Sequence, residues 1–206
     1  MLRTLNQPVA KIHAVHTGGH KAKKANSKVA KGLKAQLLLA KSARVMLIAN
    51  FWTEGGLVNG SMGTIDDIIF AETGPPSLPA VVFVKFDLYE GPSITTPEGD
   101  NVVPIVPIKR TWKSKSEKSY SRLQIPLCLA WAITVHKSQG LTLEKAKINL
   151  GSKEFAAGLS FVAVSRVRSL NDVYFKQFTF ERLQRIQSCR QLQERMNEDE
   201  RLISMT

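Results

Sequence analysis

Two short stretches of the sequence combine side chains that bind phosphate groups with residues that allow close backbone approach to a ligand. In "AITVHKSQG" (132–140), mostly apolar residues lead into His136, Lys137, Gln139 and Gly140. Lysine supplies a positive charge, histidine and glutamine supply hydrogen bonds, and glycine has no Cβ to hold a ligand away. The pattern predicts a packed helix whose last turn contacts a ligand.

The second stretch is "FVAVSRVRSL" (161–170), in which Arg166 follows a run of mostly apolar residues. An arginine held by a packed helix presents a planar set of N–H donors that matches the oxygens of a phosphate group. Taken singly, each stretch has an ordinary explanation, with Arg166 as a surface ion-pair residue and His136 as a structural histidine. Only the combination of the two stretches indicates a site.

Positive charge is concentrated at the start of the chain. The 206 residues carry a formal net charge of +12, and residues 1–50 contain ten Lys and Arg but no Asp or Glu. A basic segment of this kind binds polyanions by releasing their condensed counterions, which makes nucleic acid the first partner to consider. A solvated, partly flexible arm explains the same charge equally well.

The composition is that of a globular protein, with 43% hydrophobic and 22% charged residues. Two cysteines, Cys128 and Cys189, predict reduced thiols inside a cell rather than a disulfide framework. No stretch reaches the roughly 18–20 apolar residues of a membrane span, so we expect no membrane partner. His13, His16 and His20 lack a supporting Cys or carboxylate, and we therefore expect no metal site.

Strands and helices alternate around the two stretches. The apolar patterns predict buried strands at 145–151 and 172–178, and helices at 154–168 and from 180 onward. Such alternation indicates a parallel sheet with helices against it.

The preceding part of the chain has the pattern of a small β-barrel. Strand-like runs at 64–70, 80–87 and 101–112 are separated by segments rich in Gly and Pro, and Asn59-Gly60 with Gly63 predicts a turn before the first of them. The other expectations are strands at 36–40 and 45–49, a flexible loop at 18–32 and a polar linker at 113–121.

In this order and spacing, the motifs resemble a known family. "ARVMLIANFWTEGGLVNG", "LAWAITVHKSQGLTL" and "FVAVSRVR" are similar to the C-terminal half of the petite-integration-frequency DNA helicases of superfamily one, including relatives encoded by Helitron transposons. The resemblance implies an α/β fold, namely a second RecA-like domain (a parallel sheet with flanking helices) interrupted by a small Src-homology-3-like β-barrel insert. The implied divisions are a basic, partly flexible segment at 1–35, the RecA-like domain at 36–59 and 121–180, the barrel at 60–120 and a C-terminal helix at 181–206.

The resemblance also implies roles for individual residues. Residues 134–143 are similar to helicase motif V, which touches single-stranded DNA and couples it to the nucleotide. Residues 162–168 are similar to motif VI, whose arginine reaches the γ-phosphate of ATP, where its charge stabilises the departing phosphoryl group. The implied catalytic residue is Arg166, the implied cofactor-binding residues are Gln139, Gly140 and Arg166, and the implied DNA-binding residues are Thr134, His136 and Lys137.

The sequence lacks two parts of an ATP site. No G-x-x-x-x-G-K-[ST] loop occurs, and no acidic magnesium-binding strand precedes the motifs. The resemblance therefore implies the C-terminal motor portion of an ATP-dependent 5′-to-3′ DNA helicase that is inactive alone and shares ATP and magnesium with a missing N-terminal RecA-like domain, in cis or in trans.

Single-stranded DNA is the implied partner of such a motor portion, and the nucleus is favoured over the mitochondrion as its location. The alternative is a non-enzymatic, basic nucleic-acid-binding module derived from a helicase.

Overall fold

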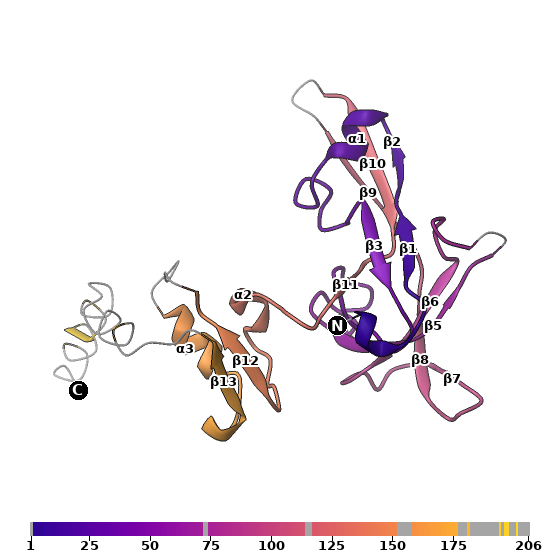
Figure 1. The fold of residues 1–206 in the computed structure, drawn as a ribbon. Coiled ribbons are helices and arrows are strands. Elements are labelled where there is room, and N and C mark those ends of the chain that lie inside the picture. Colours follow the sequence, from indigo (N-terminus) through magenta and orange to yellow (C-terminus); the bar gives the residue numbers. More distant parts are fainter. Residues whose placement is uncertain are drawn as a thin grey trace. The chain divides into compact units, whose positions relative to one another are not determined.

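The computed structural model describes residues 2–71, 74–113, 117–151 and 158–176, together with residues 181, 194, 196, 197 and 201. The chain forms two compact units, Met1–Ala132 and Ile133–Thr206. Figure 1 shows the elements of both units. Within the described ranges, no helix is long and apolar enough to cross a membrane.

The first unit consists mainly of antiparallel strands. One sheet has six strands in the order β11-β4-β5-β6-β8-β7, a second has the order β2-β10-β9, and β1 pairs with β3. In chain order the elements are η1 (Leu2–Leu5), β1 (Ala10–His13), β2 (Val15–Thr17), α1 (His20–Lys24), β3 (Gln36–Leu39), β4 (Arg44–Leu47), β5 (Met62–Ile69), β6 (Val81–Phe86), β7 (Ile94–Thr95), β8 (Asn101–Ile105), β9 (Ile108–Lys113), β10 (Ser119–Gln124) and β11 (Leu127–Leu129).

The core of the first unit lies against the six-stranded sheet. Side chains on β6 alternate between the two faces, so that Val82, Val84 and Phe86 are buried while the residues between them are more exposed. The same core includes Ile12 from β1 and Leu39 from β3, which are both fully buried. Burying an aliphatic side chain of this size contributes about 1.5–3 kcal/mol, so the β1-β3 pair is held to the larger sheet mainly by apolar contact.

The turn before β5 follows from the Asn59-Gly60 dipeptide. Gly60 has a φ of 111°, and its backbone N–H donates to the Leu47 carbonyl oxygen at 2.9 Å. Gly63, which the sequence predicted to belong to this turn, lies inside β5 instead. An added Cβ at Gly63 would stand 2.6 Å from the carbonyl oxygen of Lys85 on the neighbouring strand. Glycine is therefore required there by close strand contact rather than by a turn.

Most of the predicted strands are present, and the differences have local causes. The extended segment predicted at 101–112 is divided into β8 and β9, because Pro107 lies between them and has no N–H to donate to a ladder. The linker predicted at 113–121 is shorter, since β10 begins at Ser119. Strands β5, β6 and β8 belong to a sheet that also contains β4 and β11, from outside the predicted barrel range 60–120. The boundaries of a barrel insert therefore stay a prediction.

The second unit contains a parallel strand pair. Strands β12 and β13 pair in parallel, with Ala146 opposite Val173 and Asn149 opposite Lys176. Helix α3 lies between them in the sequence, which is the β-α-β order expected of a parallel sheet. The elements are α2 (Val135–Ser138), β12 (Ala146–Asn149), α3 (Leu159–Val164), η2 (Leu170–Asp172) and β13 (Val173–Lys176). Apart from isolated positions, the helix predicted at 181–206 lies outside the described residues.

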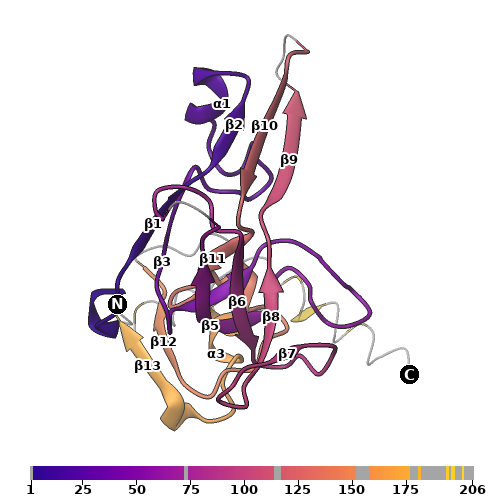
Figure 2. The ribbon, with the colours of Figure 1, turned by 90° about the vertical axis from the view of Figure 1, so that its right-hand side faces the viewer.

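A buried arginine organises residues 18–34, part of which the sequence predicted to be a flexible loop. Arg122 on β10 has 0% exposure, and its guanidinium donates to the carbonyl oxygens of Ala22 at 3.0 Å, Ala25 at 2.7 Å and Leu33 at 2.7 Å. Ala22 and Ala25 lie at the end of α1, where helix carbonyls have no partner within the helix. The arginine thereby fixes α1 and the segment after it to β10, next to which α1 lies (Figure 2).

The surroundings of Arg122 keep its neighbour His16 neutral. The Nε of Arg122 donates to Nδ1 of His16 at 3.4 Å, and the guanidinium lies 5.8 Å from the centroid of the Trp112 ring. Burial lowers the pKa of His16, and the positive charges of Arg122 and Lys23 lower it further. A neutral imidazole has a free nitrogen lone pair, so His16 serves as a hydrogen-bond acceptor for the arginine.

We expect Arg122→Met to lower the free energy of unfolding by about 3 kcal/mol, because two buried carbonyl groups and one partly buried carbonyl group lose their donor, and an unsatisfied buried group costs roughly 1–3 kcal/mol. Urea unfolding followed by circular dichroism measures the change. The matched control is Lys109→Met on the neighbouring strand β9, where the side chain is exposed and the expected change is within about 0.5 kcal/mol. Equal losses in the two variants would contradict the role given to Arg122.

Candidate functional site

The second unit brings the two predicted motifs side by side. The backbone N–H of Leu143 donates to the carbonyl oxygen of Arg166 at 2.7 Å, and Leu143 forms a parallel bridge with Val167. Helices α2 and α3 are also in contact. Residues 134–143 and 161–170, which are separate in the sequence, therefore form one continuous piece of structure.

Helix α2 presents polar side chains on its outer surface. It is a single turn, shorter than the sequence suggested, and the carbonyl oxygen of its N-cap Thr134 accepts hydrogen bonds from the N–H groups of Lys137 at 2.9 Å and Ser138 at 3.1 Å. The side chains of Thr134, His136 and Lys137 are exposed. Ser138 is buried, and its hydroxyl donates to the Val135 carbonyl oxygen at 2.8 Å. The three predicted DNA-binding residues thus lie on the open side of the turn.

Gly140 allows the chain to reverse after α2. Gln139 is the C-cap of the helix, Gly140 has a φ of 82°, and the N–H of Leu141 then donates to the Ser138 carbonyl oxygen at 3.0 Å. The left-handed region costs other residues roughly 1–2 kcal/mol. No atom of the residues that the structure describes lies within 4 Å of a Cβ added at Gly140. Glycine is therefore required by backbone conformation, and the space beside it is open. Gln139 is exposed as well.

Arg166 follows α3 and folds its guanidinium group onto both motifs. Its Nε donates to the Val162 carbonyl oxygen at 2.9 Å, its Nη2 to the Ser165 hydroxyl at 2.8 Å and its Nη1 to the Leu141 carbonyl oxygen at 3.5 Å. The last distance is at the limit of a hydrogen bond. The side chain is half-buried, and within the described part of the chain it forms no ion pair with a carboxylate.

The sequence did not predict two of the groups that contact Arg166, the hydroxyl of Ser165 and the carbonyl oxygen of Leu141. Ser165 uses its hydroxyl as an acceptor for Arg166 and as a donor to the Val162 carbonyl oxygen at 3.2 Å. Its position directly before the arginine is the only signal that the sequence gives for it. Leu141 contributes a backbone carbonyl, which every residue type provides, so no side-chain pattern could have identified it.

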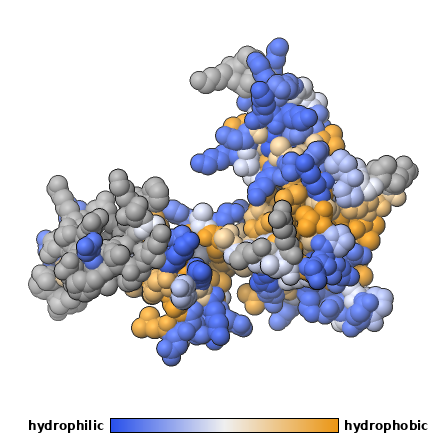
Figure 3. All heavy atoms as spheres, viewed as in Figure 1, coloured by the Kyte–Doolittle hydropathy of each residue, from blue (hydrophilic) through white to orange (hydrophobic). Residues whose placement is uncertain are grey.

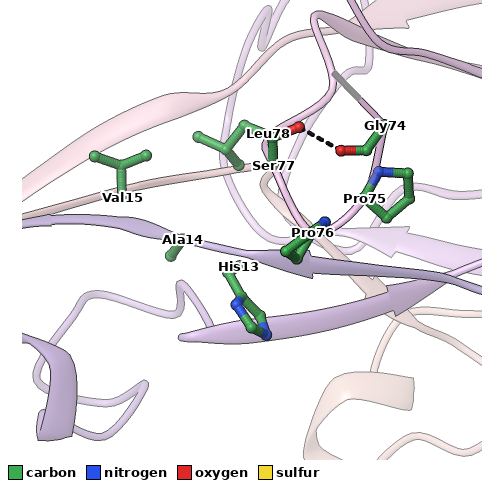
Figure 4. Close-up of a pocket in the computed structure, with 8 residues that line it drawn as sticks. All are labelled: His13, Ala14, Val15, Gly74, Pro75, Pro76, Ser77 and Leu78. Carbon is green, nitrogen blue, oxygen red and sulfur yellow. Dashed lines mark hydrogen bonds between the residues drawn. The ribbon is translucent and has the colours of Figure 1, made fainter.

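A shallow hollow in the first unit contains none of the predicted site residues. It is lined by residues 13–15 and 74–78, and Figure 4 shows that proline rings and small side chains surround much of it. The N–H of His13 donates to the Pro76 carbonyl oxygen at 2.8 Å, which ties its two sides together. Among the described residues, its lining includes no Asp, Glu, Lys or Arg.

A metal centre is also not found in the ranges that the structure describes, since no three His, Cys, Asp or Glu side chains there are grouped suitably.

Comparison with known proteins identifies a set of relatives, although no family model matches the chain. The human ATP-dependent DNA helicase PIF1 is 34% identical over 170 residues, which cover 82% of this chain and 24% of that protein. The Xenopus laevis ATP-dependent DNA helicase PIF1 is 36% identical over 144 residues, which cover 69% of this chain and 20% of that protein. The chain thus spans about a fifth to a quarter of the length of these relatives.

Solved structures agree with the sequence relatives. The Pif1 helicase from Candida albicans has a TM-score of 0.64 at 28% identity, over 86% of this chain and 42% of that one. The Bacteroides Pif1 bound to ssDNA has a TM-score of 0.62 at 25% identity, over 88% of this chain and 39% of that one. The mixed α/β fold, with its parallel pair and joined motifs, is therefore that of part of a DNA helicase motor. Within this class the chain belongs to the Pif1-type helicases, which confirms the resemblance drawn from the motifs.

We expect Gly140→Ala to destabilise the second unit by about 1 kcal/mol, since the methyl group meets no neighbour but alanine disfavours a positive φ. Gly140→Asn should lose less, because asparagine tolerates this conformation better. Thermal unfolding of both variants and of Gly74→Ala, another glycine with open space but without a positive φ, gives the comparison. The interpretation is wrong if Gly140→Ala and Gly74→Ala behave alike.

Proposed function

We propose that the chain is the C-terminal motor portion of an ATP-dependent helicase that unwinds duplex DNA in the 5′-to-3′ direction. It acts together with an N-terminal RecA-like domain, in cis or in trans, that holds most of the nucleotide. The observation that carries the proposal is the 2.7 Å hydrogen bond between Leu143 and Arg166, because it joins the DNA motif directly to the motif that carries the arginine. A motor needs such a connection between its DNA contact and its nucleotide contact.

Arg166 is the proposed catalytic residue. The Nε bond to Val162 anchors the side chain, whereas the Nη groups have replaceable partners, an exposed hydroxyl and a carbonyl 3.5 Å away. Exchange of these two partners for oxygens of the γ-phosphate would turn the planar fork toward ATP without moving α3. There the guanidinium stabilises the negative charge that develops as the phosphoryl group leaves.

Gln139 and Gly140 complete the proposed nucleotide contact of this chain. ATP would supply the phosphoryl group and magnesium would neutralise its charge, and we assign the magnesium ligands to the N-terminal domain because no acidic magnesium-binding strand precedes the motifs in this sequence. A relative supports the nucleotide and single-strand contacts in general, since the Bacteroides Pif1 in complex with ADP-AlF3 and ssDNA has a TM-score of 0.60 at 25% identity.

Single-stranded DNA is the proposed ligand of Thr134, His136 and Lys137. These exposed side chains lie on one short turn, where a hydroxyl, an imidazole and an ammonium group all hydrogen-bond to phosphate oxygens. A shift of α2 along the strand would be transmitted through residues 141–143 to the backbone of Arg166. DNA movement and the position of the arginine would then change together.

The finer fold and location belong to the same proposal. The parallel pair β12-β13 with α3 supports a second RecA-like domain, and the short antiparallel strands within 60–120 support a Src-homology-3-like insert. The similarity to the human DNA helicase PIF1 makes the nucleus the proposed location. The alternative of a non-enzymatic nucleic-acid-binding module would keep DNA binding but never gain turnover from an added N-terminal domain.

We expect the chain alone to show no DNA-stimulated ATPase activity and to gain it when an N-terminal Pif1-type RecA-like domain is added or fused. In that assembly, Arg166→Ala should lower kcat by roughly a thousandfold while leaving affinity for single-stranded DNA nearly unchanged, as expected for an arginine finger. Arg168→Ala, an exposed arginine of the same motif, is the matched control. Parallel loss of turnover and DNA affinity in Arg166→Ala would count against the finger role.

We expect His136→Ala and Lys137→Ala each to weaken binding of a fluorescent single-stranded oligonucleotide by about three- to tenfold at fixed salt, because each loses one phosphate contact. Fluorescence anisotropy measures the affinity. Lys145→Ala, an exposed lysine outside the motif, should bind like the unmodified chain. Unchanged affinity in both motif variants would show that the strand binds elsewhere.

A further inference from the structure

Residues 20–34, which we call the lysine platform, carry a dense group of positive charges that the proposed motor site does not use. The platform contains six exposed lysines: Lys21, Lys23, Lys24, Lys28, Lys31 and Lys34. No acidic residue occurs anywhere in residues 1–50, and in the parts of the chain that the structure describes none of these lysines forms an ion pair. Figure 3 shows hydrophilic residues gathered over the end of the first unit that carries α1.

The backbone of the platform is held in place by hydrogen bonds despite the electrostatic repulsion between its lysines. Six like charges in a short segment repel one another, and an untethered segment of this kind would extend into solvent. Here the guanidinium of Arg122 binds three carbonyl oxygens of the platform, and Ala22, Ala30 and Leu33 are buried beneath it. Because the backbone that carries the lysines is already fixed, a ligand that binds several of them at once has to order only the side chains and not the backbone.

The chemistry of the platform selects phosphate groups rather than bases. Residues 20–34 contain no Phe, Tyr or Trp on which a base could stack. The Trp112 ring, which contacts the guanidinium of Arg122, is stacked with Tyr120 at 6.2 Å between ring centroids. The platform therefore has a high density of charge without a Phe, Tyr or Trp ring for base stacking, so its affinity should follow mainly the charge density of the ligand.

We infer that the lysine platform is a docking surface for the phosphate backbone of duplex DNA, separate from the single-strand contact on α2. A duplex carries one phosphate per about 1.7 Å of its axis and a single strand about half that density, so a surface that reads charge alone prefers the duplex. This inference rests on the proposed function, in which duplex DNA is the substrate that the motor unwinds. The lysine platform would then be a contact for that duplex on the first unit.

Salt dependence of duplex binding tests the inference. The probe is a fluorescent 20-base-pair blunt duplex, titrated by anisotropy between about 50 and 200 mM salt with the 206-residue chain. The triple variant Lys21→Ala, Lys24→Ala, Lys28→Ala should bind more than tenfold more weakly at 100 mM salt. Its slope of log affinity against log salt should be shallower by up to about 2.7, at about 0.9 per lost phosphate contact. All three side chains are exposed, so the variant should fold, and circular dichroism checks this.

The matched control removes the same charge from elsewhere in the first unit. Lys11→Ala, Lys41→Ala and Lys118→Ala together also lower the net charge by three, from exposed positions outside the platform, and should change affinity less than threefold. Equal losses in the two triple variants would overturn the inference, because net charge alone would then explain binding. Tighter platform-dependent binding to phosphatidylserine vesicles than to the duplex would overturn the assignment to DNA.

The two proposals fail separately. The single-strand contact is tested by His136→Ala and Lys137→Ala with a single-stranded oligonucleotide, whereas the platform is tested by the triple variant with a duplex. Loss of single-strand binding in the motif variants, with unchanged duplex binding in the platform variant, would support the motor and refute the platform.

Discussion

The hydrogen bond from the Leu143 N–H to the Arg166 carbonyl oxygen is the contact on which the second unit depends. It converts two sequence motifs into one piece of structure, with the exposed groups proposed to contact DNA on the first motif and the guanidinium group of Arg166 on the second. Because the connection is made through backbone atoms, the coupling does not depend on which side chains occupy residues 141–143. The parallel pair β12-β13 joins the segments that follow the two motifs, since β12 follows the first motif and β13 follows the second.

A single arginine has a comparable role in the first unit. Arg122 satisfies three carbonyl oxygens that a short helix and its following turn would otherwise leave without donors, and a neutral His16 and the Trp112 ring complete its surroundings. A five-residue helix is not stable by itself. The segment rich in lysine is therefore folded because of a residue about one hundred positions away. Each unit thus has one arginine that donates hydrogen bonds to backbone carbonyl oxygens. Arg122 has a structural role in the first unit, and Arg166 in the second unit is proposed to exchange two of its partners for phosphate oxygens.

The sequence predicts the strands and the motifs well because both depend on local patterns. Alternating apolar residues locate β5 and β6, Asn59-Gly60 locates the turn before β5, and the spacing of the two motifs identifies the family. The features that the sequence did not predict depend on contacts between residues that are distant in the chain. The role of Gly63 is set by the Lys85 carbonyl on a paired strand, and the order in residues 18–34 is set by Arg122. The sheet that joins β4 and β11 to β5 likewise follows from pairing that no local pattern records.

The central claim is that Arg166 recognises the transition state of ATP hydrolysis rather than the nucleotide in general. Its most direct test is the affinity of the chain, assembled with an N-terminal RecA-like domain, for ADP with and without aluminium fluoride. We expect Arg166→Lys, which keeps the charge but loses the planar fork, to weaken the aluminium fluoride complex at least about a hundredfold while ADP alone binds as before. Equal weakening of both complexes would contradict the proposed role of Arg166, because the arginine would then bind the ground state and the transition state alike.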